Sequence, residues 1–147
     1  MSFGQTFSET ITINATPEAV WAALTDPSLM RRWMSETPIE VVTEWKVGEP
    51  IVVRGDWYKT GFTNKGIVER FEPGRLLRYT HLSSLSRLTD DAENYTVFEF
   101  RLAPEDARTI LTVTVSNFPT EAIYRHMVFY WNVAVELLRR FVEARQS

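Results

Sequence analysis

Residues Thr120–Ala144, TEAIYRHMVFYWNVAVELLRRFVEA, decide the fold. The Thr120 hydroxyl can cap a helix, which at 1.5 Å per residue would then run for about 37 Å. Its apolar residues form two adjacent stripes at helical spacing, namely Ile123, Met127, Tyr130, Ala134, Leu137 and Phe141, with Val128, Trp131, Val135, Leu138 and Val142 beside them. An apolar face of this width is typical of a covered helix. We therefore expect a long C-terminal helix that lies across a sheet.

The sequence before this helix contains two short helices and a series of strands. Thr16-Pro17 starts a helix that Asp26-Pro27 ends, and a second helix follows over about 27–34. Alternation of apolar and polar residues predicts strands over 3–13, 39–42, 51–58, 62–71, 76–82, 95–102 and 109–115. A polar loop over 85–93 and a hairpin turn at 104–106 separate the later strands. The order β-α-α-β6-α predicts an α+β protein in which a curved antiparallel sheet of six to seven strands surrounds the C-terminal helix.

Composition restricts the chemistry available to the chain. The 147 residues include 5 Trp, 5 Tyr and 9 Phe, but no Cys and only 2 His. These counts exclude a disulfide scaffold, thiol chemistry and a Cys-ligated or His-rich metal site. A net charge of −3 without a basic cluster argues against nucleic-acid binding. Without a signal peptide or an 18-residue apolar stretch, we expect a cytoplasmic protein that does not span a membrane.

Several segments, in order, resemble one family. They are VWAALTDP at 20–27 with Trp33, WKVGEPI at 45–51, GIVERFEPGRLLRYT at 66–80, and Trp131 with Leu138. Together they span about residues 10 to 143, and the chain resembles the SRPBCC (START-like) superfamily, in the branch named after the activator of Hsp90 ATPase homologue, C-terminal domain. The resemblance implies the helix-grip fold, with an apolar cavity between the sheet and the long helix. We take residues 1–147 as a single helix-grip domain.

Aromatic side chains are the main candidates for a binding site in such a cavity. We expect the ligand-binding residues to be Trp33, Trp57, Tyr79, His81, Phe98, Phe118 and Trp131. Tyr79 and His81 would orient a ligand through hydrogen bonds. The alternative interpretation is that these rings interdigitate as an ordinary core. Arg54 is expected at the surface, unless a bulge near Gly55 aims it at an acidic ligand group.

Three functions remain open at this stage. The first is binding of a hydrophobic or aromatic small molecule in the internal cavity, without a cofactor. The second, suggested by the family name, is a co-chaperone or stress-response protein that acts through protein–protein contact. The third is an enzyme like the polyketide cyclases of the superfamily, for which Tyr79 and His81 would be the acid–base groups. We assign no catalytic residue, no metal ligand and no cofactor, and a homodimer stays open.

Overall fold

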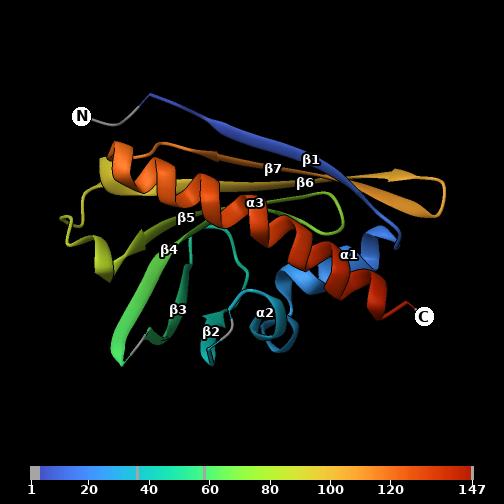
Figure 1. The fold of residues 1–147 in the computed structure, drawn as a ribbon, viewed down its shortest axis with the longest axis horizontal. Coiled ribbons are helices and arrows are strands. Elements are labelled where there is room, and N and C mark those ends of the chain that lie inside the picture. The colour runs from blue at the N-terminus through green and yellow to red at the C-terminus, as the bar shows by residue number, and fades with distance from the viewer. Residues whose placement is uncertain (1–3, 36, 58, 147) are drawn as a thin grey trace.

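The computed structural model of the protein describes residues 4–35, 37–57 and 59–146, apart from the side chain of Trp57. Within these ranges the chain forms seven strands, three α-helices and two short 3-10 turns (Figure 1). The elements are β1 (Phe7–Ile13), α1 (Pro17–Thr25), α2 (Pro27–Trp33), β2 (Ile39–Thr43), β3 (Pro50–Trp57), β4 (Thr60–Glu72), β5 (Leu76–Ser83), η1 (Ser84–Ser86), η2 (Ala92–Asn94), β6 (Thr96–Glu105), β7 (Arg108–Ser116) and α3 (Glu121–Ala144).

The seven described strands form one antiparallel sheet in the order β1-β7-β6-β5-β4-β3-β2. Figure 1 shows α3 along one face of this sheet, roughly parallel to β1, β6 and β7, whereas β2, β3 and β4 run steeply away from that direction. The predicted α+β class, element order and helix-grip architecture are confirmed. The sheet is thus bent, so that β2 to β4 run in a different direction from β1, β6 and β7.

Side-chain caps start each α-helix where the sequence predicts it. Thr16 accepts a hydrogen bond from the Ala19 amide at the start of α1, and Thr120 accepts one from the Ile123 amide at the start of α3. Asp26 both ends α1 and caps α2 through the Ser28 amide. In the part of the chain that the structure describes, no helix has both the length and the apolar character needed to cross a bilayer.

The core lies between α3 and the inner face of β5, β6 and β7. Alternate residues of the strands point inward, so Phe98, Phe100 and Leu102 of β6 are buried, as predicted. The same alternation buries Leu111, Val113 and Val115 of β7. From α3 the buried residues are Trp131, Ala134, Val135, Leu138 and Val142. The inner face of these strands and the apolar face of α3 therefore pack against each other, and both faces follow from the spacing of apolar residues in the sequence.

Three details differ from the sequence-based expectations. The first strand begins at Phe7 rather than at residue 3. The hairpin turn lies at 106–107, with Asp106 at φ 56°, because β6 continues through Pro104 to Glu105. Proline is tolerated there since β5 pairs with β6 only as far as Arg101, which leaves one side of β6 open. Leu137, placed in the covered stripe by its spacing, is 43% exposed.

Gly66 allows the sheet to bend between β4 and β5. A Cβ at this position would lie 1.7 Å from the backbone oxygen of Thr80 on the neighbouring strand. The pairing of β4 with β5 is interrupted between Lys65 and Val68, and the register shifts by one residue between Val68 and Arg70. Because only glycine permits this approach, Gly66 fixes the point at which β4 turns away.

We therefore expect Gly66→Ala to destabilise the protein strongly. The added methyl group must push β4 and β5 apart, and the free energy of unfolding should fall by about 3 kcal/mol or more. Gly61→Ala in the same strand is the matched control, since its Cβ would meet its nearest neighbour at an ordinary 3.7 Å. Urea unfolding of both variants measures the difference. Equal stability of the two variants would show that the close approach of Gly66 to Thr80 is not required.

Candidate functional site

A cavity of about 560 Å³ lies between the inner face of the sheet and the N-terminal half of α3. Strands β2 to β6 form its floor, and Ile123, Met127 and Trp131 of α3 form its roof. Its exposed lining residues include Leu85 beyond β5 and His126 on α3. The cavity therefore opens to solvent between the segment that follows β5 and the first turns of α3.

Aromatic rings form the inner end of the cavity. Tyr79 of β5 meets Phe98 of β6 edge-on, with ring centroids 5.5 Å apart, and Phe98 meets Trp131 in the same way at 5.5 Å. His81 lies over Phe98 at 4.9 Å. The pairing of Tyr79 with Phe98 across β5 and β6 brings these rings together from separate strands. They present an apolar surface suited to a planar or hydrophobic molecule.

Neutral polar groups line the cavity beside these rings. Tyr79, His81 and Ser83 alternate along β5 and share its inner face, where His81 pairs with Thr96 of β6 and Ser83 pairs with Asn64 of β4. The strand register thus sets hydroxyl, imidazole and amide groups next to one another on the floor of the cavity.

Several of these polar groups have no hydrogen-bond partner in the described part of the chain. The Oδ1 atom of Asn64 and the Nε1 atom of Trp131 are buried and unpaired. The hydroxyl groups of Tyr79 and Thr96 and both ring nitrogens of His81 also form no hydrogen bond with the described residues. Leaving a buried polar group unpaired costs about 1–3 kcal/mol, and native proteins pair nearly all of them. The groups around the cavity are therefore available to another molecule.

The lining carries no formal charge apart from what its two histidines can acquire. Among the described residues that line the cavity there is no Asp, Glu, Lys or Arg. Burial, and secondarily the neighbouring His126, lowers the pKa of His81 from 6.5 to about 4, so its imidazole is neutral at pH 7. Burial raises the pKa of Tyr79 well above its ordinary value and that of Tyr130 to about 12. The floor of the cavity is thus a neutral surface at physiological pH.

The structure brings four of the seven expected site residues to this cavity, namely Tyr79, His81, Phe98 and Trp131. Trp33 lies elsewhere, because its indole N–H donates to the Ala23 carbonyl oxygen at 2.8 Å and ties α2 to α1. Phe118 is fully buried against Tyr124 and belongs to the framework. The side chain of Trp57 lies outside the described residues.

Other lining residues were not among the expected ones. Asn64 and Phe62 share the inner face of β4 with Val68, so alternation along that strand is the signal that could have found them. Thr96 shares the inner face of β6 with Phe98 and could have been found in the same way. Met34 belongs to the irregular segment after α2, which no periodicity marks; its carbonyl oxygen accepts a hydrogen bond from the Tyr130 hydroxyl of α3.

Arg54 lies at the surface, as alternation along its strand predicts. Its guanidinium pairs with the Glu40 carboxylate of β2 at 3.1 Å, and both side chains are more than half exposed. The pairing of β3 with both of its neighbours is regular at this point, so no bulge turns the side chain inward. Arg54 therefore cannot place a positive charge in the cavity.

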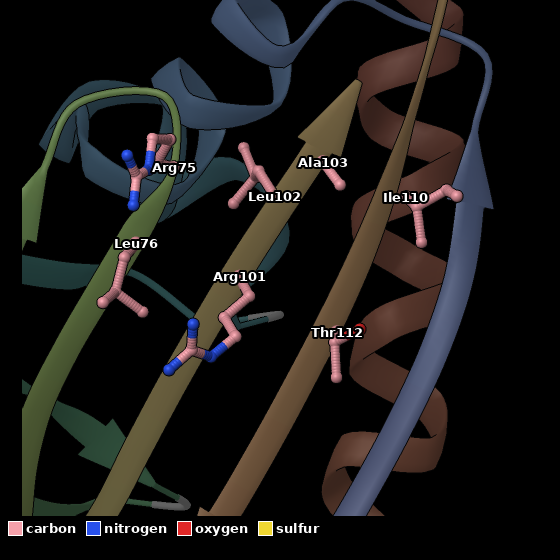
Figure 2. A pocket seen from close by; sticks show the side chains of 7 residues that line it. All are labelled: Arg75, Leu76, Arg101, Leu102, Ala103, Ile110 and Thr112. Atoms are coloured by element: carbon pink, nitrogen blue, oxygen red, sulfur yellow. The ribbon is translucent and has the colours of Figure 1, made fainter. Parts of the chain in front are cut away.

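A second depression lies on the outer face of the sheet, away from α3 (Figure 2). Its volume is about 360 Å³, and Ile110 and Thr112 of β7 form part of its floor. Arg75 and Arg101 stand over it, but each is exposed and paired with a carboxylate, Arg75 with Glu72 at 3.3 Å and Arg101 with Glu99 at 2.9 Å. These arginines form a solvated surface rather than an anion site.

No cluster of three or more His, Asp or Glu side chains that could hold a metal ion occurs among the described residues. The acidic segment after η1 instead forms contacts of its own. Asp90 pairs with Lys65 and accepts a hydrogen bond from the Tyr95 hydroxyl at 2.6 Å, which fixes the loop to β4. Of the two depressions, the cavity between the sheet and α3 is the better candidate for a ligand site.

The lowered pKa of His81 predicts a loss of stability in acid. In the unfolded chain the imidazole binds a proton near pH 6.5, whereas in the folded protein it does so only near pH 4. Between these values the unfolded state binds more protons, so the free energy of unfolding falls as the pH is lowered from 6.5 to 4. At about 1.4 kcal/mol per pKa unit, the contribution of His81 to this loss is about 3 kcal/mol. Urea unfolding over this range of pH measures it.

Two variants separate His81 from the other acid-sensitive groups. His81→Gln cannot titrate and should flatten the decline between pH 6.5 and 4. His126→Gln, whose side chain is exposed at the mouth of the cavity, should retain most of the decline. If His81→Gln declines as steeply as the parent protein, the imidazole is not held neutral by burial.

Residues 14–143 match the family model described as activator of Hsp90 ATPase homolog 1-like protein. The solution structure of ChR145 from Cytophaga hutchinsonii is 31% identical, with a TM-score of 0.83 over 99% of this chain and 98% of that one. Protein MLL2253 from Mesorhizobium loti is 25% identical, with a TM-score of 0.78 over 95% and 98% of the two chains.

CalU16 from Micromonospora echinospora shares the fold at 21% identity and a TM-score of 0.73, over 97% of this chain and 79% of that one. No protein of curated function matches the chain significantly. The family match covers most of the sequence, and the structural matches extend over nearly the whole chain. The protein belongs to the activator of Hsp90 ATPase homolog 1-like family, with the SRPBCC-type fold.

Proposed function

We propose that the protein binds a hydrophobic or aromatic small molecule in the cavity between the sheet and α3. The observation that carries this proposal is the cavity of about 560 Å³ with Tyr79, Phe98 and Trp131 at its inner end. Pockets for small ligands typically enclose about 300–1,000 Å³ and are lined mainly by apolar and aromatic side chains. Both the size and the lining of this cavity fall in that class.

Apolar burial would supply most of the affinity. Each 100 Å² of apolar ligand surface removed from water contributes about 2.5 kcal/mol before the costs of association. The rings of Phe98 and Trp131 are held by edge-on contacts within the core, so they would lose little freedom on binding. A rigid aromatic wall of this kind favours a rigid, apolar partner over a flexible chain.

Catalysis and co-chaperone action rest on the resemblance alone. A general base works best when its pKa lies near the working pH, and His81, at about 4, is a weak base at neutrality. Tyr79, with its pKa raised by burial, does not ionise near neutrality. Binding therefore has more support than turnover from the groups that line the cavity.

We expect N-phenyl-1-naphthylamine, an uncharged fluorophore that brightens in apolar surroundings, to bind the protein with a saturable increase in fluorescence. Ile123→Trp should abolish or strongly weaken this signal, because the larger side chain projects from the roof into the cavity. Val133→Trp is the matched control on the same helix, since Val133 is 47% exposed and does not line the cavity. It should bind the fluorophore as the parent protein does.

Native mass spectrometry of freshly purified protein offers an independent test, because it detects a small molecule that co-purifies with the protein. An added mass that is present in the parent protein and in Val133→Trp, and reduced in Ile123→Trp, would support the proposal. Equal fluorophore binding by both tryptophan variants would place the fluorophore outside the cavity and contradict it.

A further inference from the structure

The unpaired polar groups of the cavity come from four elements and converge on one space. Thr96 of β6 is 2% exposed, and its partner across the strands is His81 of β5, with Tyr79 two residues before it on the same face. Asn64 reaches the cavity from β4 and Trp131 from α3. Their clustering follows from the strand register, and none of these polar groups forms a hydrogen bond with the described residues of the chain.

These groups offer both donors and acceptors of hydrogen bonds. The Trp131 indole can only donate, and the unpaired Oδ1 of Asn64 can only accept. The hydroxyl groups of Tyr79 and Thr96 can do either, and a neutral imidazole has one N–H and one bare nitrogen. Water can bond the groups that the cavity exposes, but a ligand that displaces this water must replace its hydrogen bonds or lose affinity. A pure hydrocarbon would leave them unpaired.

The lining also discriminates by charge. A carboxylate that enters the cavity gives up its hydration, and no Arg or Lys among the described lining residues meets it there. An ammonium group finds no Asp or Glu in the described lining, and only the faces of the aromatic rings can attract it. His126 lies near enough to His81 to act on it electrostatically, but its side chain is exposed at the mouth, where solvent screens its interaction with a charge on the ligand.

We propose that the cavity selects uncharged ligands that carry a hydrogen-bonding group, such as an alcohol, phenol, ketone or amide on an apolar body, and that it rejects carboxylates of the same shape. This inference rests on the proposed function and narrows it to one chemical class. The polar group of the ligand lies against Tyr79, His81 and Thr96, and its apolar body lies against Phe98 and the roof formed by α3.

Three probes of one shape test this selectivity. Naphthalene has no polar group, 2-naphthamide adds an uncharged amide, and 2-naphthoate at pH 7.5 places a negative charge at the same position. Titration calorimetry, or the shift of protein NMR resonances where solubility limits the heat, measures each affinity. We expect 2-naphthamide to bind at least about ten-fold more tightly than 2-naphthoate, which corresponds to about 1.4 kcal/mol.

Two conservative variants test the polar contacts. Thr96→Val and Tyr79→Phe keep the shape of the cavity and remove one hydroxyl each. Each should weaken 2-naphthamide about 3- to 10-fold and leave naphthalene binding unchanged, a split that a general loss of structure would not produce. Thr12→Val is the matched control, since Thr12 is exposed on the outer side of β1 and should leave both affinities unaltered.

The outcomes distinguish this inference from the function on which it rests. If 2-naphthoate binds as tightly as 2-naphthamide, or if both variants bind 2-naphthamide as the parent protein does, the selectivity is overturned while small-molecule binding stands. If neither naphthalene nor 2-naphthamide binds, the proposed function fails, and the selectivity fails with it.

Discussion

The contact of Trp131 with β6 is the interaction on which the rest of the structure depends. Trp131 is 1% exposed, and its ring meets Phe98 and Phe100 edge-on at 5.5 Å each. Beyond it toward the C-terminus, α3 buries every residue of one stripe against the sheet, as Leu138 and Val142 show. Before it, Ile123 and Met127 are only partly buried and face the cavity. Trp131 thus divides α3 into a half that holds the sheet and a half that covers a space.

The bend of the sheet supplies the other side of that space. At Gly66 the backbone of β4 approaches Thr80 too closely for any side chain, and β2 to β4 turn away from the direction of β6 and β7 (Figure 1). The side chains of Phe62 and Asn64 of β4 consequently line the cavity instead of packing against α3. The cavity therefore arises because the floor curves away from a straight helix.

Local patterns predict most of the fold and only part of the site. The caps at Thr16 and Thr120 and the alternation along β6 depend on neighbouring residues, so they can be recognised in the sequence. Alternation along β5 likewise places Tyr79 and His81 on the inner face of the sheet. The position of Trp33 could not be predicted in this way, because it depends on a hydrogen bond to Ala23, ten residues away on another helix. Residue type and parity indicate which way a side chain points, but only the three-dimensional path of the chain decides whether core or cavity lies there.

The cavity is costly to the stability of the protein, and this cost favours a ligand as the reason for its polar lining. The Oδ1 atom of Asn64 and the Nε1 atom of Trp131 are buried without a hydrogen-bond partner among the described residues, and each such group costs about 1–3 kcal/mol. A fold that needed only a stable core would gain from apolar side chains of similar size at both positions. A bound ligand offsets this cost only when it supplies hydrogen-bonding groups to the same side of the cavity. These unpaired groups beside the cavity therefore favour the proposed binding of a ligand over a purely structural role for the lining.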